Sequence, residues 1–138
     1  MRKYLRISFY YAIAAMVGGV FYREFTKWNG FTGVTALGKV HVHLFLLGMM
    51  MFLFVALFSE HHDLEGEQNF GLFLKLYNIG VPLTAVMLVV RGIVQVKAIP
   101  VSSGLDASIS GIAGIAHILT GTGLVLLFLA LMQMKDKK

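Results

Sequence analysis

The amino-acid sequence predicts an all-α integral membrane protein, built as a four-helix bundle of membrane-spanning helices. Of its 138 residues, 57% are hydrophobic and only 14% are charged, and its mean hydropathy is +0.76. Soluble domains carry about a quarter charged residues, so this composition is typical of a membrane protein with short loops. Four apolar segments of about 20 residues or more each match the thickness of a bilayer. We expect residues 1–138 to form a single four-span domain.

The expected spans cover residues 4–22, 35–58, 70–98 and 106–134. The first span is rich in large aromatic residues and ends without a small-x-small cleavage site, so we expect it to be retained and not removed as a signal peptide. A polar loop at 23–33 follows it and contains the turn signal Asn29-Gly30. Asp106 is expected to be the N-cap of the last span.

Charge and cysteine content narrow the classes of partner. The sequence has no cysteine, which excludes disulfides and thiolate ligands. The net charge of +5 is spread over chain ends and loops, so it indicates lipid contact and not a nucleic-acid partner, which needs a basic stripe. With both termini on one side, that side holds more of the 12 lysines and arginines, and this favours a cytoplasmic N-terminus and C-terminus.

Two histidines, His41 and His43, lie near the start of the second apolar segment. Residues two apart on an α-helix point about 200° apart, so these side chains face opposite sides and are suited to two different neighbours. A histidine inside a membrane span is costly enough to indicate a function. The alternative is that both are helix-end histidines bonded to carbonyl groups or water.

Other polar residues are expected at a similar depth. Because consecutive spans alternate direction, His117 and Arg91 belong to the same leaflet as the histidine pair, with Arg23 nearer the surface. Imidazoles at matched depth with cations above them are what a buried haem b requires for its axial ligands and propionates. A divalent metal site is a second interpretation. His117 could instead be a packing histidine, and Arg91 could pair with Glu24 or Asp106.

Two further groups admit a metal-binding interpretation that we regard as secondary. The methionines at 49–51 resemble soft copper ligands, but consecutive helix positions face different ways, which favours packing. His61 and His62 lie in the acidic segment expected to be a solvated loop, where a labile surface metal site is the alternative.

Several motifs together resemble a family of small four-span bacterial membrane proteins of unknown function. The resemblance extends over nearly the whole chain and is carried by residues 21–33, 41–43, 77–80, 91–95 and 104–117. It implies the four-span fold and a location in the bacterial cytoplasmic membrane, but it implies little chemistry.

The His41-Val-His43 motif also resembles one third of the catalytic subunit of haem–copper oxidases. That subunit has twelve spans in three equivalent groups of four, and one of its inner helices carries a His-x-His that ligates two haems. The resemblance implies that His41 and His43 are axial ligands and that three chains assemble into a twelve-helix homotrimer. The third span has no histidine, so the oxidases' copper site has no counterpart and oxygen reduction is not implied.

The sequence therefore predicts a haem b-binding membrane protein with histidine axial ligands, acting in electron transfer or in binding or sensing a diatomic gas. The residues expected to hold the haem are His41, His43, His117, Arg91 and Arg23. Its expected partners are the lipid bilayer and further copies of the chain. Enzymatic activity, the redox partner and the substrate are left open. The alternative is a non-haem protein, either a metal-binding or transport module or a structural membrane subunit.

Overall fold

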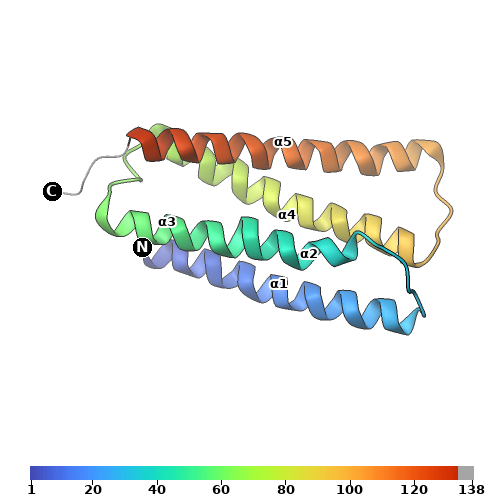
Figure 1. Ribbon diagram of the computed structural model, residues 1–138. Helices are drawn as coiled ribbons and strands as arrows, with labels where there is room; N and C mark the ends of the chain where they lie inside the picture. Colours follow the sequence, from blue (N-terminus) through green and yellow to red (C-terminus); the bar gives the residue numbers. More distant parts are fainter. Residues whose placement is uncertain (134–138) are drawn as a thin grey trace.

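A computed structural model of the protein describes residues 1–133, and its elements are all helices, which confirms the all-α prediction for this part of the chain (Figure 1). In chain order they are α1 (Arg2–Trp28), α2 (Leu37–His43), the π-helix η1 (Leu44–Met50), α3 (Met51–His61), α4 (Gln68–Val96) and α5 (Ser103–Gln133).

Four helices are long and apolar enough to cross a membrane, as the sequence predicts. The second of these joins α2, η1 and α3 into one continuous helix, Leu37–His61, of 25 residues. The other three are α1, α4 and α5, with 27, 29 and 31 residues. At a rise of 1.5 Å per residue, even 25 residues extend about 37 Å, more than the ~30 Å hydrocarbon core of a bilayer.

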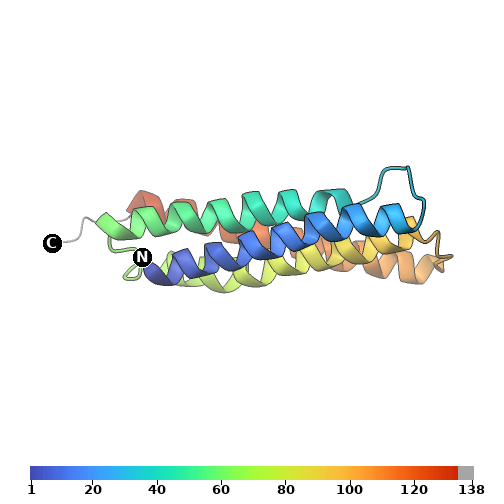
Figure 2. The same cartoon turned by 90° about the horizontal axis from the view of Figure 1, so that it is seen from below.

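The helices run alternately up and down and pack mainly with their neighbours in sequence (Figures 1 and 2). Helix α1 packs along the second span, α4 packs against α2 and η1, and α5 packs against α4. The α1–α2 and α4–α5 connections therefore lie at one end of the bundle (Figure 1). Polar residues near these connections are brought to the same level, as expected from the alternating direction of the spans.

Helix α1 is longer than predicted. It continues to Trp28, so the first part of the expected loop at 23–33 is helical, because nothing in it before Asn29 breaks a helix. The Asn29 side chain donates a hydrogen bond to the carbonyl of Phe25 at 2.7 Å. The turn at Asn29-Gly30 is confirmed, since Gly30 adopts a left-handed φ of 58° that glycine accepts without strain.

The beginning of α5 also differs from the prediction. Asp106 lies inside the first turn and is not the N-cap, because the helix begins at Ser103. The Ser102 hydroxyl takes the capping role by accepting a hydrogen bond from the backbone N–H of Leu105 at 3.2 Å. The expected end of this span near Met134 lies outside the described residues.

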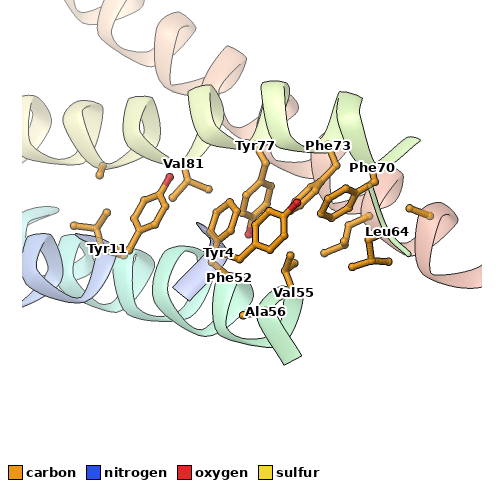
Figure 3. Close-up of a cluster of buried hydrophobic side chains, with 14 of the residues drawn as sticks. Tyr4, Tyr11, Phe52, Val55, Ala56, Leu64, Phe70, Phe73, Tyr77 and Val81 are labelled. Carbon is orange, nitrogen blue, oxygen red and sulfur yellow. The ribbon is translucent and has the colours of Figure 1, made fainter. Parts of the chain in front are cut away.

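An aromatic cluster holds α1, the second span and α4 together (Figure 3). Phe52 is fully buried at its centre. Its ring lies 5.7 Å from that of Tyr11 and 6.0 Å from that of Phe73, measured between centroids. Aromatic pairs at such distances add about 0.5–1.5 kcal/mol each beyond the area they bury. These contacts fix the relative positions of three helices.

The π-helix η1 directly follows His43 and is shaped by α1. A side chain at Gly48 would collide with the Tyr11 ring, so glycine is needed for α1 to approach. The Ser8 hydroxyl donates a hydrogen bond to the Met49 carbonyl at 2.8 Å. In a membrane, carbonyl groups released by irregular helix geometry need such partners from neighbouring helices.

Two glycines of α4 set close contacts with other helices. A Cβ at Gly80 would lie 2.6 Å from the backbone nitrogen of Thr120 in α5. A Cβ at Gly92 would lie 2.6 Å from the backbone nitrogen of Leu37, where the second span begins. Small residues allow helix backbones to approach this closely in membranes.

Gly80→Ala is expected to lower stability, because the added methyl group meets the backbone of Thr120. Overpacking of this kind costs about 1–3 kcal/mol, which should appear as a lower midpoint of thermal unfolding in detergent micelles. Gly71→Ala is the matched control in the same helix, since nothing lies within 4 Å of its Cβ position. Equal midpoints for the two variants would contradict the close α4–α5 contact.

Candidate functional site

His43 is the last residue of α2, and its ring is held by its own helix. The ring nitrogen Nδ1 lies 2.9 Å from the backbone carbonyl oxygen of Lys39. Because a carbonyl oxygen only accepts, Nδ1 carries the proton and Nε2 is left with a free lone pair. This carbonyl bond is the one expected for a helix-end histidine, and it is equally the bond that orients a histidine as a metal ligand.

His41 lies on the α1 side of the second span. A Cβ on Gly19 would be 3.6 Å from the Cβ of His41, an ordinary contact distance, so His41 faces α1 at this point. The ring is half buried, and its Nδ1 is buried without a hydrogen-bond partner in the part of the chain that the structure describes. A buried polar atom in this state costs about 1–3 kcal/mol. His41 and His43 thus have different surroundings.

Arg91 is paired with Asp106, one of the two carboxylates considered as its partner. One guanidinium nitrogen contacts the Asp106 carboxylate directly. The other donates to the Ser110 hydroxyl at 2.8 Å and approaches the Asp106 carbonyl at 3.4 Å. The guanidinium fork therefore ties the end of α4 to the first two turns of α5.

His117 lies in the same region, further along α5. Its Nδ1 is 2.7 Å from the carbonyl oxygen of Ala113, so the neutral ring donates to the backbone four residues earlier and leaves Nε2 as an acceptor. The residue is exposed. It lines a groove of about 290 Å³ between α4 and α5 that also includes Arg91 and Ser110.

The structure brings some of the predicted site residues together and separates others. Arg91 and His117 share the groove, whereas His41 and His43 belong to the second span and do not line it. Arg23 does not line the groove either, and 82% of its side chain is exposed, with its Nε 3.8 Å from Glu24. The groove also contains Thr84, which sequence reasoning missed. An isolated hydroxyl in an apolar span is its only signal in the sequence.

The other metal-binding interpretations receive no support from geometry. Within residues 1–133, no group of three or more histidine, cysteine, aspartate or glutamate side chains is placed to hold a metal ion. Met49 and Met51 pack against the aromatic core. His61 ends α3 and is not part of a loop, and with His62 it borders a mainly aromatic and aliphatic pocket.

Four helices long and apolar enough to cross a membrane, with ionisable residues within them, are compatible with the class of multi-pass α-helical membrane proteins. The chain belongs to the family described as "Protein of unknown function (DUF2871)", which matches residues 1–134. No curated protein matches the chain, and no solved structure matches it. The resemblance to a four-span family of unknown function is confirmed, while the resemblance to haem–copper oxidases has no support from these comparisons.

Arg91→Leu should destabilise the protein, because it leaves the Asp106 carboxylate in the membrane region without its cation. We expect a loss of about 1–2 kcal/mol, because half of the Asp106 side chain is exposed (51%) and the ion pair is therefore only partly buried. Arg91→Lys should recover part of this, because lysine lacks the fork that reaches Asp106 and Ser110 together. Thermal unfolding in detergent measures both.

Arg23→Leu is the matched control, because Arg23 is 82% exposed and makes a single 3.8 Å contact with Glu24. Its unfolding midpoint should match that of the unaltered protein. If Arg91→Leu behaves in the same way, Arg91 merely extends to the membrane surface and does not join α4 to α5.

Proposed function

We propose that this protein binds haem b within the bacterial cytoplasmic membrane, with both chain termini on the cytoplasmic side, and that His41 and His43 are axial ligands. The haem serves one-electron transfer or, with one axial position open, the binding or sensing of a diatomic gas. The observation that carries the proposal is the orientation of His43. Its Nδ1 is fixed by the Lys39 carbonyl at 2.9 Å, which leaves Nε2 as a ligand.

The donor set fits haem better than it fits a bare metal ion. Without cysteine, imidazole is the strongest axial ligand that the chain offers. A metal-ligating histidine usually donates its second ring N–H to a carbonyl or carboxylate, which fixes its tautomer and orientation, and His43 is held in this way. A bare ion needs several ligands converging from one chain, and residues 1–133 bring no such group together.

The opposed directions of His41 and His43 favour an assembly of several chains. Because the two residues belong to one α-helix, a single chain cannot direct both at one haem. In a ring of identical chains, His41 of one chain and His43 of the next would meet at each interface. The oxidase resemblance suggests three chains, twelve spans and one haem per interface. His117 is the alternative second ligand if the haem lies within one chain.

Arg91 and Arg23 differ in how readily each could pair with a haem propionate. Arg91 is a candidate for a haem propionate, but it already holds Asp106 and Ser110 and would have to share its donors. Arg23 is exposed and not committed to a strong partner, since its nearest carboxylate, Glu24, is 3.8 Å away. A propionate near the membrane surface is therefore more easily matched by Arg23.

His43→Ala and His41→Ala are each expected to abolish or strongly alter the haem absorption spectrum, because each removes an axial nitrogen. A reduced-minus-oxidised spectrum of the purified membrane protein measures the effect. His61→Ala is the control, since His61 lies at the opposite end of the second span. Unaltered spectra in both single variants would refute the ligation. A colourless protein containing stoichiometric copper or zinc would favour the non-haem alternative.

The trimer is tested by native mass spectrometry in mild detergent. We expect a dominant species of three chains carrying three haems, because each interface would complete one pair of axial ligands. His43→Ala should remove haem from all three interfaces. A haem-loaded monomer would contradict the ring and would transfer the second ligand role to His117.

A further inference from the structure

The groove between α4 and α5 has two polar ends and apolar walls. It is lined by Thr84, Met87, Leu88 and Arg91 from α4 and by Ile109, Ser110, Ala113 and His117 from α5, and has a volume of about 290 Å³. Met87 and Ile109 are buried and form its floor, whereas Ser110 and His117 are exposed along its open edge. Close contact between Gly80 and Thr120 brings the two helices together one turn beyond Thr84.

The polar ends are separated along the helix axes. Arg91 and Ser110 are joined by a hydrogen bond of 2.8 Å and form the outer end. Thr84 precedes Arg91 by seven residues on α4, and His117 follows Ser110 by seven residues on the antiparallel α5. Seven residues correspond to about 10 Å of helix. Thr84 and His117 therefore form an inner end two turns deeper in the membrane.

The two ends of the groove can hydrogen-bond to different groups of a ligand. At the inner end, the neutral imidazole of His117 donates its Nδ1 proton to Ala113, and its Nε2 then accepts a hydrogen bond. At the outer end, the Ser110 hydroxyl accepts from Arg91 and keeps its own hydrogen for donation. A ligand that bridges the ends thus needs a donor at one end and an acceptor at the other, with an apolar body between them.

From this pattern we infer that the α4–α5 groove binds the head group of a hydroquinone. One phenolic O–H donates to Nε2 of His117, and the oxygen on the opposite side of the ring accepts from Ser110 or Arg91. Oxygens in para positions of a six-membered ring lie about 5 Å apart, and with one hydrogen bond at each end they span about 10 Å. The ring lies between apolar walls, and its hydrocarbon tail leaves through the open edge into lipid.

Charge favours this neutral ligand over the anionic head group of a phospholipid. The positive charge of Arg91 is already compensated by Asp106, so the outer end does not require an anion. The unprotonated Nε2 at the inner end offers a phosphate no donor. Thr84 adds a second requirement for a polar ligand, because its hydroxyl is buried with no hydrogen-bond partner in the described residues.

The groove does not use His41 or His43, the axial ligands proposed above. If the protein binds a hydroquinone but no haem, this inference stands and the proposed function fails. If the protein binds haem but no hydroquinone, the proposed function stands and this inference fails. The two proposals are therefore tested separately on the same purified protein.

The test uses the full chain in lipid nanodiscs and titrates it with decylubiquinol under anaerobic conditions, followed by calorimetry. We expect saturable binding, with decylubiquinone binding about tenfold more weakly because a quinone carbonyl cannot donate to His117. The dimethyl ether of decylubiquinol should also bind weakly, since it has lost both donors.

His117→Ala should raise the dissociation constant of decylubiquinol about tenfold and remove the preference for quinol over quinone. A role confined to stability would not change that preference. Ser110→Ala should weaken quinol and quinone alike, because both offer an acceptor to the outer end. His61→Ala is the control and should leave both dissociation constants unchanged.

Four results would overturn the inference. The first is the absence of saturable decylubiquinol binding. The second is an unchanged quinol preference in His117→Ala. The third is loss of the haem spectrum in His117→Ala, which would make His117 an axial ligand. The fourth is decylubiquinol binding that is seen in nanodiscs of phosphatidylcholine but lost in nanodiscs of phosphatidylglycerol, which would assign the groove to an anionic lipid instead.

Discussion

The ion pair between Arg91 and Asp106 is the interaction on which the arrangement of the functional region depends. A guanidinium inside a membrane span needs an anionic partner, and Asp106 and Ser110 supply the contacts from the first two turns of α5. This fixes the register of α5 on α4, and the register in turn places His117 beside Thr84. The neighbouring residue Gly92 contacts the start of the second span, where the Thr35 hydroxyl donates a hydrogen bond to the Gly92 carbonyl at 3.2 Å. The same turn of α4 thus contacts the start of the second span, which carries His41 and His43, and the start of α5, which carries His117.

A second constraint acts on the helix that carries His41 and His43. Directly after His43 the backbone changes from α-helix to π-helix over Leu44–Met50, and π-helical segments are often found at functional sites. The change is accommodated by Tyr11, which lies against Gly48, and by Ser8, which donates to the Met49 carbonyl. The aromatic cluster beyond it keeps the rest of this span packed against α1 and α4. The histidine pair therefore precedes a rigidly packed segment whose side chains are turned relative to a regular helix.

Sequence reasoning could predict the features that depend on composition and on short-range chemistry. Four apolar segments form four helices long enough to span a bilayer. Arg91 needs an anion, for which the sequence offered Glu24, Asp106 or a haem propionate, and the structure pairs it with Asp106. The π-helix could not be predicted, because it depends on contacts with Tyr11 and Ser8 from another span. Asp106 was misassigned as a cap because its partner lies on a different helix. Thr84 could not be identified from the sequence, because its relevance depends on the groove that α4 and α5 form together. Haem ligation stays a prediction.

Depth in the membrane relates the histidine pair to the α4–α5 groove. His43 follows the start of its span, Leu37, by six residues, and Arg91 precedes the end of α4 by five, which correspond to about 9 Å and 8 Å of helix. Both helix ends lie together, because the Ala36 N–H donates to the Gln95 side chain at 2.7 Å. His43 and the outer end of the groove are therefore at nearly the same depth. His117 lies 14 residues from the start of α5, about 21 Å along the helix and close to the middle of its length. A ligand bridging the groove would extend from the middle of α5 to the level of His43, along helices that are long and apolar enough to lie in a bilayer.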